Sequence, residues 1–225
     1  NCRFEQNSAR YFGGGVMVNG ASGGSTAPRF YNCVFEANRA LSNGGGLYKY
    51  GASEVERGVD LDSCVFIRNS AVTRGGGLFY VDSDGQDSIG FQDCIFEKNE
   101  AGIAGGGCGF FLGRAGKSHF SMQKTIFNAN ASDAGAAVYW FANGFNDFDG
   151  KIDVDSSTFE SNISYGSTGS IVYNALIAIH QSEIRFVANI FEENNTSALI
   201  LDISFEGDES SGLIEGAIFK NNHKS

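Results

Sequence analysis

Two aspartates near the middle of the sequence, Asp153 and Asp155, alternate with apolar residues. Alternate residues of a strand share one face, so both carboxylates are predicted to point outward together. Two further acids, Asp147 and Asp149, precede this run, and Arg185 follows Asp153 by 32 residues. Hydrolysis of a glycosidic bond requires a carboxylate pair. The group is therefore a candidate site for polysaccharide chemistry, and the alternative is a set of solvated surface acids.

A second acidic group, formed by Asp82, Asp84 and Asp87, surrounds Gly85. Oxygen ligands alternating around a glycine turn suit a hard cation such as calcium. The sequence thus predicts a calcium site here, with an ordinary Asp/Gly turn as the alternative. No metal or triad spacing connects the three histidines, which are His119, His180 and His223.

A repeat in the sequence predicts the strands that position these groups. Eight phenylalanines are each followed three positions later by asparagine, and the intervals between the phenylalanines are 31, 31, 30, 31, 32, 32 and 28 residues. A fixed period of this length indicates a repeat architecture. The pairs are Phe4/Asn7, Phe35/Asn38, Phe66/Asn69, Phe96/Asn99, Phe127/Asn130, Phe159/Asn162, Phe191/Asn194 and Phe219/Asn222.

Each period contains three short strand signals: an alternating run, a C-x-F step and an apolar run after a glycine triplet such as Gly75-Gly76-Gly77. No segment shows a helical apolar period with good caps. The sequence predicts an all-β parallel β-helix solenoid of about 31 residues per coil and roughly seven coils. Equivalent residues then stack about 4.8 Å apart. Five phenylalanines and five asparagines of the central coils are predicted to form buried ladders: Phe35, Asn38, Phe66, Asn69, Phe96, Asn99, Phe127, Asn130, Phe159 and Asn162.

The corners of the coil are predicted from the asparagines and the glycines. Asparagine tolerates the left-handed conformation that a tight corner requires. Glycine triplets suit a corner where backbones approach closely and φ is positive.

Cysteine and sequon positions also follow the repeat. Cys2, Cys33, Cys64 and Cys94 each lie two residues before a repeat phenylalanine, and Cys108 is a fifth cysteine. They are predicted to be small buried residues, with disulfides between coils as the alternative. N-x-[ST] motifs predict glycosylation sites at Asn195, Asn130 and Asn162, and the first is the better acceptor because it is outside the ladder.

Aromatic residues are concentrated in the run after the glycines. Two adjacent aromatic positions on one strand cannot both enter the core, because strand neighbours point to opposite faces. We therefore expect an outward face that binds a partner protein or a sugar, and the alternative is an edge of the core partly covered by the chain's own loops. Its candidate residues are Tyr48, Tyr50, Phe79, Tyr80, Phe111, Trp140 and Phe141.

Composition restricts the class of protein. The unbroken period predicts one domain over residues 1–225, and the sequence begins and ends inside a repeat unit, which predicts a segment of a longer chain. A net charge of −10 argues against nucleic acid as a partner. The sequence contains no apolar run of the length that a transmembrane helix needs, so no membrane insertion is expected.

The F-x-x-N unit followed by a glycine-rich apolar step resembles the repeats of the chlamydial polymorphic membrane proteins and, more widely, right-handed parallel β-helix repeats. That resemblance implies a right-handed coil, an extracellular or cell-surface location, and a structural or adhesive role without catalysis. The partners would be other protein chains, flanking repeats of the same chain or carbohydrate. The fold also resembles pectate lyases and polygalacturonases, so a pectin-lyase-like polysaccharide-active enzyme is the alternative.

Overall fold

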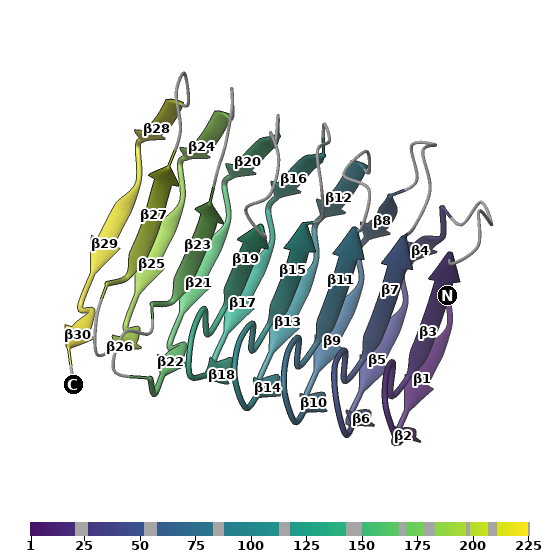
Figure 1. The fold of residues 1–225 in the computed structure, drawn as a ribbon. Coiled ribbons are helices and arrows are strands. Elements are labelled where there is room, and N and C mark those ends of the chain that lie inside the picture. The colour runs from purple at the N-terminus through teal and green to yellow at the C-terminus, as the bar shows by residue number, and fades with distance from the viewer. Residues whose placement is uncertain are drawn as a thin grey trace.

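The computed structural model describes residues 1–20, 27–51, 58–82, 88–112, 118–142, 150–166, 170–177, 183–196, 199–206 and 211–224. All regular structure in these ranges is β-strand, and they contain no helix long and apolar enough to cross a membrane. The strands pair in parallel with their equivalents in neighbouring coils (Figure 1). The chain is thus an all-β parallel solenoid of stacked coils about 31 residues apart.

The strands form four parallel sheets, two of 8 strands and two of 7. Sheet 1 contains β1 (Arg3–Glu5), β5 (Val34–Glu36), β9 (Val65–Ile67), β13 (Ile95–Glu97), β17 (Ile126–Asn128), β21 (Thr158–Glu160), β25 (Ile190–Glu192) and β29 (Ile218–Lys220). Sheet 2 contains β2 (Ser8–Ala9), β6 (Arg39–Ala40), β10 (Ser70–Ala71), β14 (Glu100–Ala101), β18 (Ala131–Ser132), β22 (Ile163–Ser164), β26 (Asn195–Thr196) and β30 (His223–Lys224). Sheet 3 contains β3 (Val16–Gly20), β7 (Leu47–Gly51), β11 (Leu78–Asp82), β15 (Cys108–Leu112), β19 (Val138–Ala142), β23 (Val172–Ile177) and β27 (Leu201–Glu206). Sheet 4 contains β4 (Arg29–Tyr31), β8 (Val59–Asp62), β12 (Ser88–Gln92), β16 (His119–Gln123), β20 (Lys151–Asp155), β24 (Glu183–Val187) and β28 (Ser211–Glu215).

Each coil therefore has four strands, where the sequence predicts three. The additional strand is the two-residue element of sheet 2 that follows the ladder asparagine. Its second residue points inward, as Ala40 does with no exposed surface, and its first points outward. Two residues are too few to show an alternating pattern, which is why the pattern analysis misses this strand.

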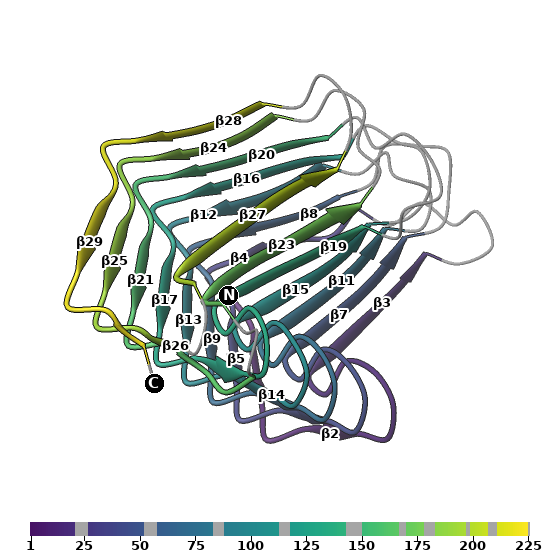
Figure 2. The same cartoon turned by 60° about the vertical axis from the view of Figure 1, so that its left-hand side comes forward.

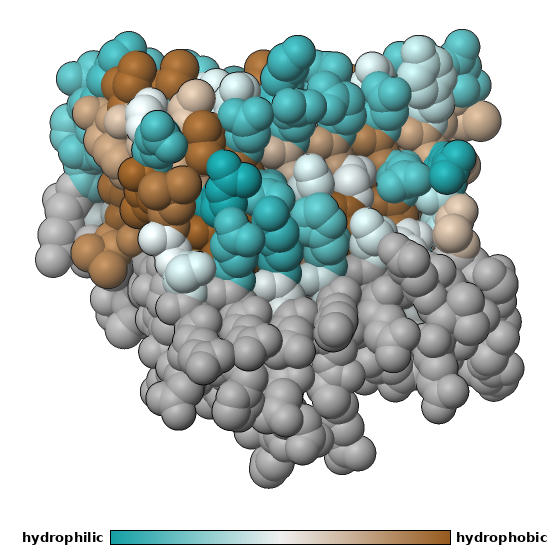
Figure 3. Space-filling model, turned by 90° about the horizontal axis from the view of Figure 1, so that it is seen from above, coloured by the Kyte–Doolittle hydropathy of each residue, from teal (hydrophilic) through white to brown (hydrophobic). Residues whose placement is uncertain are grey.

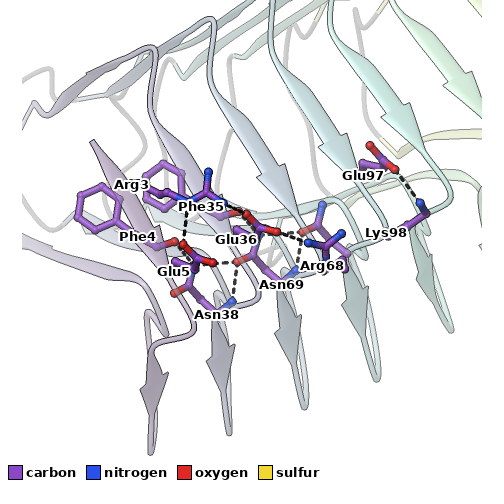
Figure 4. A network of polar contacts seen from close by, with 11 residues as sticks. Arg3, Phe4, Glu5, Phe35, Glu36, Asn38, Arg68, Asn69, Glu97 and Lys98 are labelled. Carbon is purple, nitrogen blue, oxygen red and sulfur yellow. Dashed lines mark hydrogen bonds and ion pairs between the residues drawn. The ribbon is translucent and has the colours of Figure 1, made fainter. Parts of the chain in front are cut away.

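The repeat phenylalanines form a continuous stack inside sheet 1. Phe35, Phe66, Phe96, Phe127 and Phe159 are completely buried. Centroids of successive rings in this set are 4.4 to 5.2 Å apart, and their planes differ by 2° to 8°. Figure 4 shows the first rings, Phe4 and Phe35, side by side at this face. The stack follows from parallel register, because each phenylalanine is paired with its equivalent in the next coil.

The ladder asparagines form a hydrogen-bonded column at the next corner. The Oδ1 atom of Asn69 accepts both the backbone N–H and the side-chain Nδ2 of Asn38, each at 3.0 Å. Asn69 in turn donates from Nδ2 to the carbonyl oxygen of Phe35 at 2.8 Å. The same pattern continues through Asn99, Asn130 and Asn162. Each buried amide is thus satisfied by neighbouring coils.

The left-handed residue at this corner is not the asparagine, contrary to the prediction. Positive φ occurs at the preceding residue, as at Ala37 (52°), Arg68 (54°) and Lys98 (53°). The asparagine is needed for its amide, and the residue before it makes the turn. In the glycine triplets only the first residue has positive φ, as at Gly75 (66°). The second is required by close approach of backbones, because a Cβ atom on Gly76 would overlap the carbonyl oxygens of Gly106 and Glu100.

We expect Gly76→Ala to lower the free energy of unfolding by about 1–3 kcal/mol, because backbone atoms of two strands would have to move. Gly90→Ala is the matched control, since a Cβ atom there would meet only Asp60 Oδ1, at 3.3 Å. Urea unfolding followed by circular dichroism measures both. Equal stability of the two variants would contradict the close-approach explanation.

Candidate functional site

Three successive strands of sheet 4, β16, β20 and β24, bring polar residues together on the outer face of the solenoid. Parallel register places Asp153 between Ser121 and Arg185. It also places Lys151 between His119 and Glu183. The inward residues between them, such as Ile152 and Val154, are buried in the core, and this fixes which side chains point outward.

Asp153 is the centre of this polar cluster. Its Oδ2 lies 3.3 Å from Lys151 Nζ and 3.4 Å from His119 Nε2. Its Oδ1 lies 3.6 Å from Arg185 Nη1 and is buried without a hydrogen-bond partner among the described residues. Glu183 pairs with the same two cations, at 3.4 Å from Lys151 and 3.7 Å from Arg185. The cluster therefore holds its carboxylates by ion pairs that are partly exposed.

A shallow pocket of about 280 Å³ lies beside the cluster. Asp155 is on its wall and accepts hydrogen bonds from Ser156 Oγ at 2.9 Å and Gln123 Nε2 at 3.3 Å. The lining residues are Ser121, Met122, Gln123, Asp153, Val154, Asp155, Arg185 and Val187. Figure 3 shows hydrophilic side chains over the middle coils and a more hydrophobic surface toward the end that carries β28.

The structure thus brings Asp153, Asp155 and Arg185 to one pocket. The other two acids of the predicted constellation, Asp147 and Asp149, lie outside the described residues. Ser121, Gln123, Asp153, Asp155 and Arg185 give this pocket its polar lining. The Asp153 carboxylate forms ion pairs with Lys151 and Arg185, and Asp155 accepts a hydrogen bond from Ser156 Oγ.

Sequence reasoning missed His119, Lys151 and Glu183 as members of this cluster. The repeat spacing could have identified them, because each of these residues is 32 positions from the next. Only the register between strands shows that such residues are neighbours.

The prediction of an outward aromatic face is wrong for Tyr80 and Trp140, which are completely buried in the core. They share an inward row with Lys49 and Phe110, since these four residues are in register across β7, β11, β15 and β19. The buried ammonium of Lys49 lies 5.5 Å from the ring centroid of Tyr80. The row of Lys49, Tyr80, Phe110 and Trp140 is therefore the inward row of this sheet.

The other five aromatic residues of the predicted face do point outward, but they are covered. Tyr48 and Phe79 are buried, and Tyr48 stacks on Phe12 with centroids 4.6 Å apart. Burial raises the pKa of the Tyr48 hydroxyl. Tyr50, Phe111 and Phe141 are half-buried. Tyr48 thus packs against the connection that contains Phe12, and Phe111 packs against Phe141, so these rings do not form a bare patch.

The predicted calcium ligands are only partly described. Asp82 is buried and accepts a hydrogen bond from Ser118 Oγ at 2.5 Å. Asp84 and Asp87 lie outside the described residues. Within the described ranges no three or more His, Cys, Asp or Glu side chains are grouped as metal ligands. The Asp82 carboxylate is therefore a buried hydrogen-bond acceptor within the solenoid.

Two of the predicted glycosylation sites are wrong for the folded chain. Asn130 and Asn162 are completely buried, and their amides are used in the ladder. A glycan needs a free amide at the surface. Asn195 points outward from β26 and is partly exposed, so it stays the one predicted site compatible with its position.

The cysteines are free thiols, and all except Cys2 are buried. A hydrogen bond between the thiols of Cys64 and Cys94 lowers the pKa of Cys64 to about 7 and raises that of Cys94. Burial raises the pKa of Cys108. Cys64 and Cys94 also lie 3.4 Å from the carbonyl oxygens of Phe30 and Leu61, respectively. The column is a buried structural element that the later coils continue with Thr125, Ser157 and Asn189.

A different polar network covers sheet 1. Figure 4 shows Glu36 between Arg3 and Arg68, with which it forms ion pairs, and Glu97 beside Lys98. Most of these side chains are about half exposed, so each pair contributes little to stability. These ion pairs offset the charges of Glu36 and Glu97.

The fold and the site together define the chain as a parallel β-solenoid with a polar pocket on the outer face of one sheet. Comparison with protein-family models, with curated proteins and with solved structures finds no match for this chain.

Proposed function

We propose that this chain is a non-catalytic structural and adhesive segment of a large extracellular surface or filament protein. The observation that carries the proposal is the uninterrupted stacking of phenylalanine rings and asparagine amides along the solenoid. A core that repeats in every coil gives a stiff rod with long outer faces, which suits spacing and attachment.

The resemblance of the F-x-x-N and glycine-rich unit to the repeats of the chlamydial polymorphic membrane proteins supports a surface location and a right-handed coil. Partners would be other protein chains, flanking repeats or carbohydrate. The ion pairs of Asp153 with Lys151 and Arg185 occupy this carboxylate, which supports a role without catalysis.

A polysaccharide-active enzyme is the second candidate. The convergence of Asp153, Asp155 and Arg185 on one pocket favours it. Such an enzyme would act on an acidic polysaccharide whose hydroxyl and carboxylate groups meet Gln123 and Arg185.

Incubation with acidic polysaccharides, followed by measurement of chain length, distinguishes the two candidates. We expect no depolymerisation by the chain as it stands. Cleavage that disappears in Asp153→Ala, with the fold preserved by circular dichroism, would replace the structural proposal by the enzymatic one. Asp60→Ala, an exposed acid on β8 of the same sheet, is the matched control.

A further inference from the structure

Sheet 2 and the connections from it to sheet 3 carry an unusual set of charges in the first three coils. Residues 8–15, 39–46 and 70–77 include Arg10, Arg39 and Arg74 and contain no aspartate or glutamate. The chain as a whole has a net charge of −10. Figure 2 shows these connections as a row of curved loops next to β2. A local absence of acids in so acidic a chain makes this corner distinct.

The three arginines are exposed and have no carboxylate partner among the described residues. Every other described arginine, namely Arg3, Arg29, Arg68 and Arg185, forms an ion pair. The guanidinium of Arg10 lies instead 5.5 Å from the ring centroid of Tyr11. Free guanidinium groups suit carboxylate ligands, which they can bind through two parallel hydrogen bonds.

Exposed apolar side chains lie between these arginines. Tyr11, Leu41 and Val72 are 60%, 48% and 50% exposed. The backbone hydrogen bonds from Leu41 to Ala9 and from Val72 to Ala40 place Leu41 and Val72 at the position that Arg10 occupies in the first coil, next to Tyr11. Arg39 is paired with Ser8 one coil away. Arg74 is aligned with Asn43. We call Arg10, Tyr11, Arg39, Leu41, Val72 and Arg74 the arginine corner.

We propose that the arginine corner docks an acidic polypeptide segment that also carries aliphatic side chains. Charge complementarity selects carboxylates, because three unpaired cations stand in three adjacent coils. The aliphatic residues select a protein over a polysaccharide, since sugars stack on aromatic rings and Tyr11 is the one exposed ring of the corner. The inference rests on the proposed adhesive function and names its partner class.

The test uses a fluorescent ten-residue peptide in which three glutamates alternate with leucine and valine, and anisotropy at about 50 mM and about 300 mM salt. We expect binding that weakens at the higher salt. The triple variant Arg10→Ala, Arg39→Ala, Arg74→Ala should lose about tenfold in affinity, as expected for three surface charge contacts. Arg29→Ala, which removes an exposed arginine of sheet 4, should change affinity less than about twofold.

Two further peptides test the apolar part of the inference. Lysine in place of glutamate should abolish binding, and serine in place of leucine and valine should weaken it about threefold or more. Equal binding of the serine peptide, or stronger binding of polygalacturonate, would show a general polyanion site and overturn the proposal. Self-association that depends on Arg39 in sedimentation would assign the corner to a second copy and overturn it as well.

Failure of this inference is separable from failure of the proposed function. Absence of peptide binding without any polysaccharide turnover would overturn only the arginine corner. Turnover lost in Asp153→Ala would overturn the structural role whatever the peptide does.

Discussion

Replacing Phe127 by alanine is expected to lower the free energy of unfolding by about 3–5 kcal/mol. The ring is completely buried between Phe96 and Phe159, with centroids 5.0 and 5.2 Å away. Its removal leaves a cavity in the middle of the stack, and the coils on both sides lose a packing surface. Urea unfolding of the isolated chain, followed by circular dichroism, measures the change.

The control is the neighbouring residue on the same strand. Ile126 points outward from β17 and is 39% exposed. Ile126→Ala should cost less than about 1 kcal/mol, because this side chain leaves no cavity in the core. If Phe127→Ala and Ile126→Ala lower the free energy of unfolding by similar amounts, the phenylalanine stack is not the main source of the stability of the coil.

Replacing Asn99 by alanine is expected to cost at least about 3 kcal/mol. Its Oδ1 accepts hydrogen bonds from the backbone and side-chain nitrogens of Asn69, and its Nδ2 donates to Phe66 O and Asn130 Oδ1. Alanine would leave the backbone N–H of Asn69 without its acceptor, and would remove one hydrogen-bond partner each from Asn69 Nδ2, Phe66 O and Asn130 Oδ1. Asn128→Ala, on the outer face of β17, is the control, because that side chain makes no hydrogen bond to a described residue.

The pH dependence of the stability of Asn99→Asp is a second test of the buried asparagine ladder. A buried carboxylate facing Phe66 O and Asn130 Oδ1 would have its pKa raised above the usual value of about 3.9. Because the folded pKa is then higher than the unfolded one, the variant should be most stable at low pH. It should lose stability as pH rises through the raised folded value. A variant whose stability at low pH matches that at neutral pH would contradict the buried ladder.

The class of fold could be predicted from the sequence because a solenoid repeats its constraints in every coil. The F-x-x-N pair needs the same buried ring and amide each time, so its period is visible without any contact information. The outward direction of Asp153 and Asp155 could also be predicted, because Ile152 and Val154 alternate with them. Here the polar and apolar residues separate cleanly.

For the strands of sheet 3, the sequence pattern could not show which residues point into the core and which point outward. Leu47, Tyr48, Lys49 and Tyr50 follow each other without a polar–apolar alternation, and the charged residue is the one that enters the core. The direction of Tyr80 and Trp140 was therefore decided by their register with Lys49 and Phe110. Packing against neighbouring coils overrides the preference of a single side chain.

The sequence by itself determined the period, the all-β class and the two ladders, because these depend on residues that recur at one spacing. The tertiary structure alone decided which side chains of different coils meet. Asp153 meets His119 and Arg185 only because parallel register stacks β16, β20 and β24 of successive coils. A sequence shows spacing along the chain, whereas a site on a solenoid is built across coils.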